Sequence, residues 1–299
     1  MQERTLGLLR RGSEPIVFDR QYVVELREEM QAAIDHFASR LGDHDQLWVS
    51  KHKVASVLEC EVHHLQPDEF EWTTANAKGT IAHRAIELML SWRGDPTPID
   101  LVDEALLRLA DENSGIGMWV AALTDADEAD VRGQSAERVT GFMESFPPLS
   151  RQWAPITEAS VRWPNLGPIT LAGKVDLLVG RPRGAESTKV IVDFKTGRPH
   201  ARHRQDLAFY ALLETLVREV PPRKVATFYL DAADAHAEDI TEATLNTAMR
   251  RTLDAIDMLV QLHVEGRAPT RRAGSSCRWC PLRDECEVGI DYLAGFQND

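Results

Sequence analysis

Apolar residues in the first half of the chain recur at the spacing of α-helices. Between residues 22 and 41 they stand three or four positions apart, which places them on one helical face. The same period appears in residues 80–92. Shorter stretches predict further helices over residues 101–110, 118–124 and 136–145. The first half of the chain is therefore predicted to be helical.

The second half changes to β-branched runs that predict strands. These runs cover residues 156–163, 169–179, 189–194 and 224–231. Helical periodicity returns in residues 205–220 and 241–264. This order predicts an α/β fold with helices ahead of its sheet. We expect residues 1–50 to be a helical N-terminal extension, residues 51–299 to be the main domain, and the tail from Arg267 to be loop-like and cysteine-rich.

Two predicted strands carry aspartates that are candidates for binding a metal ion. Asp176 lies late in the second strand and Asp193 ends the third. Because side chains alternate along a strand, Asp193 and Lys195 share a face while Phe194 points away. If the two strands are neighbours, Asp176 faces Asp193, and two such carboxylates repel unless a proton or cation lies between them. Oxygen ligands favour Mg²⁺ or Mn²⁺, and Lys195 would hold a cation beside that site.

A surface interpretation of these residues is also open. Most Asp-x-Lys triplets are strand ends with a salt bridge, and only the combination with Asp176 strengthens the metal hypothesis. His83, near the start of a predicted helix, is a further candidate. A lone helix histidine is more often structural than a ligand, but Gly79 precedes it and lets the chain enter the helix closely.

The distribution of charged residues affects whether the protein can bind phosphate groups. The net charge is -13, whereas phosphate binding normally rests on Lys and Arg. The acids concentrate between residues 95 and 130, and a basic strip survives after the third strand, with Arg198, Arg202, Arg204 and two histidines. Such a strip is either a solvated surface or a path for a nucleic-acid backbone.

The four cysteines fit one binding site. Cys277, Cys280 and Cys286 form C-x2-C-x5-C, and Cys60 stands far upstream. The N-terminus lacks the apolar core of a secretory signal, and no stretch reaches the roughly 18 apolar residues of a membrane span. We therefore expect a cytoplasmic protein without disulfides. Zinc and an iron–sulfur cluster are both compatible with the spacing.

Taken in order, these motifs resemble a known family. The order runs from Cys60 in SVLECEVHHL and His83 in GTIAH to Asp176 in GKVD. Asp193 and Lys195 in DFKTG follow, then a Gln/Tyr helix and C-x2-C-P-x4-C. The set resembles the RecB-like branch of the PD-(D/E)XK nuclease superfamily, and within it the iron-staple group that includes AddB-type nuclease domains and CRISPR-associated adaptation nucleases. It covers roughly residues 56 to 286.

The resemblance implies a restriction-endonuclease-like mixed sheet flanked by helices, and a DNA exonuclease of repair, recombination or defence. It implies His83, Asp176 and Asp193 as metal ligands, joined by the Phe194 carbonyl, with Lys195 as the catalytic lysine. It also implies a 4Fe-4S cluster, closing the two ends of the domain, and a helicase or other subunit as candidate partner. The four cysteines would hold that cluster, and Glu158 matches an acidic position of some relatives.

One helix departs from the family pattern. The family spacing is Q-x3-Y, but Gln205 precedes Tyr210 by five residues, and Asp206 occupies the position four before Tyr210. Positions i and i+4 are neighbours on a helix, whereas i+5 is turned away. Two alternatives to an active nuclease stay open: a nuclease-fold DNA-binding or scaffold subunit without turnover, and a zinc-clamped structural protein.

Overall fold

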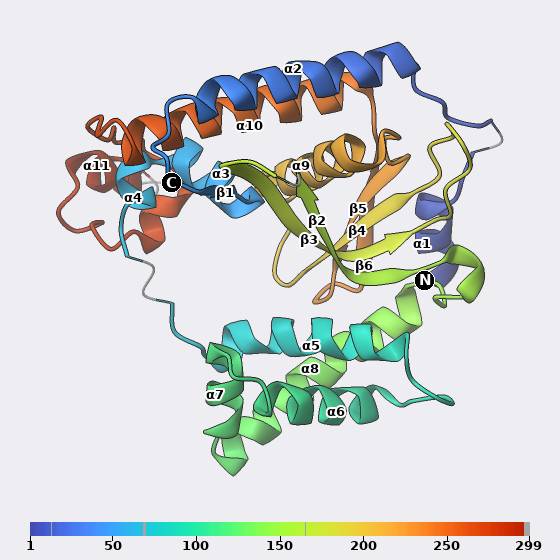
Figure 1. Cartoon of the computed structure of the whole chain (residues 1–299). Helices are drawn as coiled ribbons and strands as arrows, with labels where there is room; N and C mark the ends of the chain where they lie inside the picture. The colour runs from blue at the N-terminus through green and yellow to red at the C-terminus, as the bar shows by residue number, and fades with distance from the viewer. Residues whose placement is uncertain (13, 68–69, 165, 296–299) are drawn as a thin grey trace.

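A mixed β-sheet lies at the centre of the molecule (Figure 1). The computed structural model describes residues 1–12, 14–67, 70–164 and 166–295. Within them the six strands of the sheet are β1 (Leu47–Val49), β2 (Ile156–Trp163), β3 (Ile169–Val179), β4 (Val190–Lys195), β5 (Lys224–Tyr229) and β6 (Asp234–Asp239). The order is β1-β3-β4-β5-β6, with β2 paired to β3. The β1–β3 and β4–β5 pairs are parallel, and the others are antiparallel.

Strand β4 lies in the interior of the sheet, and its sequence explains that position. It reads VIVDFK, with its first five residues buried, which is typical of a strand covered on both faces. Ile191 belongs to the apolar core on one face, while Val192 and Phe194 belong to the core on the other. Alternation therefore sends Asp193 and Lys195 toward the first face and Phe194 toward the second, as the sequence predicted.

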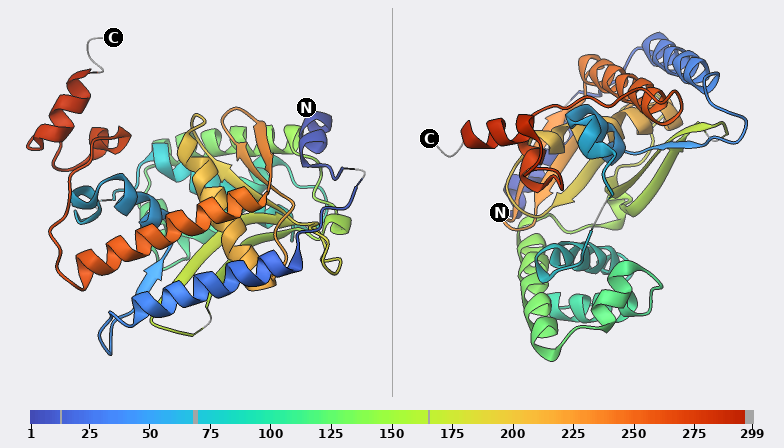
Figure 2. Two further views of the ribbon diagram at one scale, coloured as in Figure 1. Left: turned by 90° about the horizontal axis from the view of Figure 1, so that it is seen from above. Right: turned by 90° about the vertical axis from the view of Figure 1, so that its left-hand side faces the viewer.

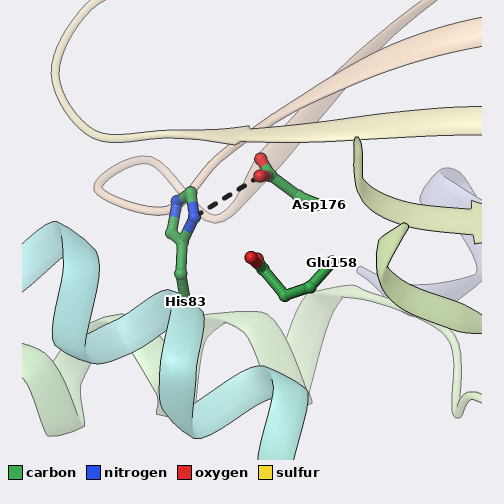
Figure 3. A group of neighbouring side chains, drawn as sticks. All are labelled: His83, Glu158 and Asp176. Carbon is green, nitrogen blue, oxygen red and sulfur yellow. Dashed lines mark ion pairs between the residues drawn. The ribbon is translucent and has the colours of Figure 1, made fainter. Parts of the chain in front are cut away.

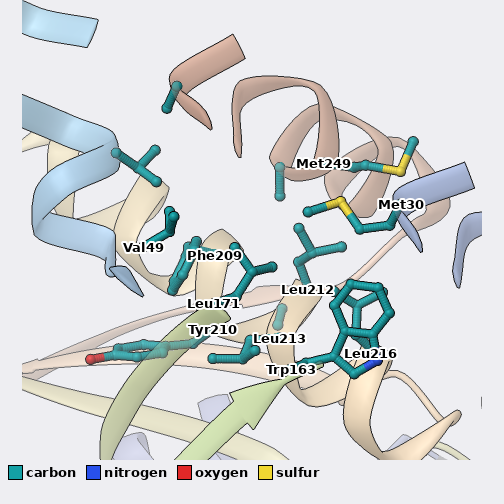
Figure 4. Close-up of a cluster of buried hydrophobic side chains, with 14 of the residues drawn as sticks. Met30, Val49, Trp163, Leu171, Phe209, Tyr210, Leu212, Leu213, Leu216 and Met249 are labelled. Carbon is teal, nitrogen blue, oxygen red and sulfur yellow. The ribbon is translucent and has the colours of Figure 1, made fainter. Parts of the chain in front are cut away.

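Helix α9 (Ala201–Arg218) covers the first face, and two long helices, α2 (Arg20–Ala38) and α10 (Glu242–His263), lie side by side over it (Figures 1 and 2). Helix α3 (Lys51–Glu59) packs against α9 and α10. Figure 4 shows Met30 and Met249 facing each other above the apolar stripe of α9. Full burial of each such side chain stabilises the fold by about 1.5–3 kcal/mol.

A second group of helices covers the other face. It consists of α5 (Thr74–Met89), α6 (Pro98–Ala110), α7 (Gly115–Ala121) and α8 (Asp125–Ser145), and it forms the lower part of Figure 1. Four phenylalanine rings, from α8, β4 and β5, join these helices to the sheet, with ring centroids 4.7 to 5.5 Å apart. Helix α1 (Gln2–Leu9) packs beside α8 and β6. The candidate site described below lies between this group and the sheet.

The C-terminal tail is more regular than predicted. It contains the 3₁₀ turn η2 (Ser275–Trp279) and helix α11 (Glu287–Gly295), so the loop prediction from Arg267 onward was wrong in part. The short helix α4 (Glu61–His64) receives the tail. Glu61 accepts hydrogen bonds from Arg267 Nη2 at 2.6 Å and from the Thr270 backbone N–H at 2.7 Å. Another 3₁₀ turn, η1 (Arg151–Trp153), precedes β2.

The predicted α/β fold class is confirmed. The sequence missed strands β6 and β1 because neither has a readable pattern of apolar residues. Strand β6 reads DAHAED and is largely polar, so only its pairing with β5 defines it. Strand β1 has three residues, too few for a period. The domain division at residue 50 stays a prediction, although β1 and α2 lie before that point and pack on the central sheet. No helix among the described residues is long and apolar enough to cross a membrane.

Candidate metal centre

Three carboxylates stand at one level of three neighbouring strands. In the β2–β3 pairing Thr157 is opposite Leu177 and Ala159 is opposite Val175, so Glu158 is opposite Asp176. The β3–β4 pairing ends at Leu177 and Val192, so Asp176 is next in line with Asp193. The expectation that Asp176 and Asp193 lie on neighbouring strands is thus confirmed. Like charges in such positions repel one another, and a cation between them relieves that repulsion.

Glu158 has a strained backbone at this level. Its φ is +51°, in the left-handed region that non-glycine residues seldom adopt. Such strain costs about 1–3 kcal/mol and collects at functional sites. The Glu158 side chain pairs with Lys174 on β3. Glu158, which the resemblance matched to an acidic position of some relatives, therefore lies directly at the carboxylate row.

Helix α5 brings His83 to the same point (Figure 3). His83 Nδ1 lies 3.7 Å from Asp176 Oδ1, and the ring packs edge-on against Phe194 at 5.5 Å. One ligand atom each from His83, Glu158 and Asp176 lies within 4.8 Å of the other two. A Cβ added to Gly79 would lie 3.1 Å from Thr196 Cγ2, so glycine permits the close approach of α5 to the turn after β4. Helix α5 begins at Thr74, so Gly79 lies within the helix, and its expected place before the helix was wrong. A cleft of about 600 Å³ opens over these residues and also contacts Lys195.

The environment of Asp176 suits a cation. Burial raises the pKa of Asp176, and the neighbouring Asp193 raises it further, while His83 lowers it. The backbone N–H of Phe194 donates to Asp176 Oδ2 at 2.6 Å. One backbone donor and one imidazole compensate little of the charge of a buried carboxylate. Two carboxylates and one imidazole thus form a donor group that fits Mg²⁺ or Mn²⁺.

Asp193, next in line with Asp176, is held between two lysines and does not belong to the three-residue donor group. Lys51 Nζ donates to Asp193 Oδ1 at 2.9 Å, and Lys195 Nζ lies 2.7 Å from Oδ2. Burial alone would raise the pKa of Asp193, but the two ammonium groups outweigh it and hold that pKa below its usual value. The sequence analysis missed Lys51. Its one local signal is Ser50, whose hydroxyl caps α3 by accepting from the Lys53 N–H at 3.3 Å.

Helix α9 contributes Asp206 and Tyr210 rather than Gln205. Helix α9 begins at Ala201, so Gln205 lies beyond its first turn and is exposed. Asp206 Oδ2 lies 3.8 Å from Lys51 Nζ and 4.0 Å from Lys195 Nζ. The Tyr210 hydroxyl donates to the Lys174 carbonyl at 2.7 Å, and its ring lies under Lys51 Nζ at 4.6 Å. In this chain Asp206 occupies the place that glutamine has in the family pattern.

The predicted basic strip is partly neutralised. Arg202 Nη1 lies 3.6 Å from a Glu59 oxygen, and Arg204 Nε lies 2.6 Å from a Glu238 oxygen. Arg198 is exposed just after Gly197, whose φ of +84° supports the turn expected after β4. Two of the three arginines therefore have acidic partners, and neither belongs to the lining of the metal cleft.

The four cysteines line one small cavity. Cys60 lies at the junction of α3 and α4, and the other three come from η2 and the turn before α11. Burial raises the pKa of the Cys280 thiol, and the three other thiols raise it further. The structure thus places the four cysteines together, as expected if they belong to one binding site.

Comparison with known proteins bears on the family. No curated protein matches the chain. A solved structure from Eubacterium rectale, whose name reads "Putative exonuclease", gives a TM-score of 0.49 at 11% identity, covering 82% of this chain and 87% of that one. The family model described as the PD-(D/E)XK nuclease superfamily matches residues 49–287. That span contains the carboxylate row, Lys195 and all four cysteines, and we conclude that the chain belongs to the PD-(D/E)XK nuclease superfamily.

Proposed function

We propose that the protein is a metal-dependent nuclease that hydrolyses DNA phosphodiester bonds. The observation that carries this proposal is the donor group of His83, Glu158 and Asp176, whose ligand atoms lie within 4.8 Å of one another. Lys195 contacts the same cleft. Membership of a nuclease superfamily supports hydrolysis over simple binding of a cation.

The proposed roles follow from position. His83, Asp176 and Asp193 are the proposed metal ligands, with Glu158 and the Phe194 carbonyl as additional oxygen donors. A bound Mg²⁺ or Mn²⁺ supplies charge stabilisation at the scissile phosphate and a water of lowered pKa. Lys195 orients the attacking water and offsets the negative charge that builds on the phosphate.

The remaining site residues have supporting roles in the proposal. Asp206 balances the charge of Lys51 and Lys195, and Tyr210 supports Lys51 through its ring. Arg198 contacts the DNA backbone, and Arg202 and Arg204 join it after release from their acidic partners. Gln205 is exposed and lines a small pocket beside Lys51 and Asp206, not the metal cleft.

The four cysteines are proposed to hold a structural 4Fe-4S cluster, as in the RecB-like branch. The four thiols line one small cavity, as a shared metal or cluster site requires, and the resemblance to that branch favours the cluster over zinc. Purified protein should be brown and contain about four iron atoms, as expected for this cluster type; colourless, zinc-loaded protein from anaerobic preparation would contradict this.

Within that branch, we propose an exonuclease that acts on free DNA ends in repair, recombination or defence, with a helicase or another protein subunit as partner. End-labelled single- and double-stranded DNA, with ends free or blocked, tests this directly. Release of mononucleotides or short fragments only from free ends supports an exonuclease. Cleavage of blocked or circular DNA at the same rate would show an endonuclease instead.

The central experiment compares Asp176→Asn and Asp193→Asn with the wild type in Mg²⁺, Mn²⁺ and EDTA. Loss of several kcal/mol of transition-state stabilisation predicts at least ~100-fold slower cleavage in either variant. Asp95→Asn, an exposed carboxylate outside the site, is the matched control. Calorimetric titration with Mn²⁺ should show weaker binding in both site variants. Unchanged cleavage by Asp193→Asn would refute the assignment.

A subunit that binds DNA without cutting it is the second candidate. The observation that favours it is the pairing of Asp193 with two ammonium groups, which occupies both of its oxygens. Such a protein would bind DNA and leave it intact with every divalent cation. Cleavage that requires Mg²⁺ or Mn²⁺ and disappears in Asp176→Asn excludes this candidate.

A further inference from the structure

A second and larger groove lies beside the cysteine cavity. It has a volume of about 1200 Å³ and is bordered by α3, α4, the start of α9 and the turn η2. Helix α3 is also the element that carries Lys51 to the carboxylate row. The groove therefore connects two regions that are far apart in sequence, the cysteine tail and the turn after β4.

The charge of this groove contrasts with that of the whole chain. The net charge is -13, but Glu59 is the one acid among the described residues that line the groove. Glu59 is compensated by Arg202, 3.6 Å away. Five of the ten histidines of the chain line the groove, together with Lys53 and Arg278. Burial lowers the pKa of His64 to about 4, so the positive charge of the lining comes mainly from its lysine and arginines. Such a lining favours a ligand that carries negative charge and accepts hydrogen bonds.

Large aromatic side chains are exposed along the same groove. Trp279 is 75% exposed and Phe70 is 55% exposed, and both belong to the lining. Trp279 stands between Cys277 and Cys280, so whatever binds the cysteines also fixes the backbone that presents this ring. Phe70 is oriented by an edge-on contact with Trp72 at 4.8 Å. Exposed aromatic rings are surfaces on which flat groups stack.

We propose that this groove binds single-stranded nucleic acid, with Trp279 and Phe70 stacking on bases and the basic side chains contacting phosphates. Stacking of this kind requires unpaired bases, because paired bases in a duplex already stack on their neighbours. Phosphate contacts from Lys and Arg supply the remaining, salt-dependent part of the affinity. The inference rests on the proposed nuclease function and specifies its substrate as a single strand.

The groove adjoins the catalytic lysine through His203. His203 Nδ1 lies 3.1 Å from the Tyr229 hydroxyl, and Tyr229 is opposite Lys195 in the β4–β5 pairing. Burial lowers the pKa of His203, and the charge of Lys195 lowers it further, which indicates that the two side chains are close. Lys195 in turn lines the metal cleft. A strand bound in the groove thus has a route past Lys195 to the carboxylate row.

Binding of a fluorescein-labelled 20-nucleotide oligothymidylate to the full chain, without divalent cations, tests the inference by anisotropy. Trp279→Ala and Phe70→Ala should each raise Kd by at least about fivefold, the lower range for loss of one stacked base. Trp279→Phe should retain most of the affinity. The control is Trp48→Ala, since Trp48 is 47% exposed but lies outside the groove lining.

Salt titration separates stacking from phosphate contacts. Lys53→Met should reduce the slope of log affinity against log salt by about 0.7, the value for one contact to a single strand. Trp279→Ala should leave that slope unchanged. The inference is overturned if Trp279→Ala and Phe70→Ala bind the oligonucleotide like the wild type. It is also overturned if both weaken a blunt duplex by the same factor.

Cleavage assays run in parallel distinguish this inference from the proposed function. If the wild type cleaves DNA with a metal and Trp279→Ala binds the oligonucleotide as tightly as the wild type, the proposed strand binding in the groove is overturned. The nuclease assignment then stands. Trp279-dependent binding without cleavage in any metal would support the groove and contradict the nuclease assignment.

Discussion

The ammonium of Lys51 donates a hydrogen bond to Asp193 Oδ1 at 2.9 Å, although 142 residues separate the two. Lys195 holds the other oxygen at 2.7 Å. Burial lowers the pKa of Lys51, but Asp193 and Asp206 outweigh it, so the net shift is upward and the side chain stays charged. Two lysines thus hold the carboxylate beside which the sequence predicted one, and Asp206 lies within 4.0 Å of both.

Lys51→Met tests whether this second lysine stabilises the carboxylate site. Removal of one partner of a buried ion pair typically costs about 3–5 kcal/mol, because the other charge stays buried. We expect a loss in the lower part of that range, since Lys195 still holds Asp193. Urea unfolding measures the loss, with Lys53→Met as control two residues further along α3.

The same variant has a metal-dependent signature. A bound divalent cation replaces part of the missing positive charge, so Mn²⁺ should raise the unfolding free energy more in Lys51→Met than in the wild type. Equal stabilisation of both proteins by Mn²⁺ would show that Lys51 and the cation do not share Asp193.

Substitutions of Glu158 separate the cost of its strained backbone from the contribution of its carboxylate to metal binding. Glu158→Gly removes the carboxylate but suits the φ of +51°, so it should raise the unfolding free energy of the metal-free protein by up to about 1 kcal/mol. Both Glu158→Gly and Glu158→Gln should weaken Mn²⁺ binding about 10-fold, a reduction of ~1.4 kcal/mol. Calorimetry on the two variants measures this. Unchanged Mn²⁺ affinity in both would remove Glu158 from the donor group.

Gly173 controls the position of Tyr210. A Cβ at residue 173 would lie 2.6 Å from Tyr210 Cε1, so Gly173→Ala must displace the ring that supports Lys51. Overpacking of this kind costs about 1–3 kcal/mol, and we expect slower cleavage because the lysine loses its support. Gly133→Ala is the matched control, since nothing lies within 4 Å of its Cβ on α8. That variant should be stabilised by ~0.5–1 kcal/mol. Equal melting temperatures for the two variants would contradict the argument.

Glu61 connects stability to pH. Hydrogen bonds from Arg267 lower the pKa of Glu61 from 4.5 to about 2 in the folded protein, although burial opposes the shift. The charged form is therefore favoured by folding, and its contribution of about 3 kcal/mol is complete above pH 4.5. It is lost as the pH falls from 4.5 toward 2.

Urea unfolding of Glu61→Gln at several pH values measures this contribution. The wild type should exceed the variant by that amount at pH 7, and the difference should shrink below pH 4.5. Glu285→Gln, an exposed carboxylate of the same tail, should show no such trend. If the difference in unfolding free energy stays constant down to pH 3, Glu61 stabilises the fold by packing and not by its charge.

Local sequence determined the residue types and the faces they share. Alternation along β4 put Asp193 and Lys195 on one side of the sheet and Phe194 on the other, because the period of a strand is fixed by its backbone. The helical periods marked α2, α6 and α10 for the same reason. The cysteine spacing grouped the three tail thiols. These features depend on neighbours in the chain, so they are readable without a structure.

The tertiary structure decided which of these residues meet. The register of β2 on β3 placed Glu158 opposite Asp176, and nothing near Glu158 in sequence encodes that alignment. Lys51 reached Asp193 because α3 packs against α9. The start of α9 at Ala201, four residues earlier than expected, put Gln205 beyond the first turn, so helical geometry keeps it off the face that Asp206 and Tyr210 share. Contacts between distant segments depend on packing and register, and a local period carries no information about either.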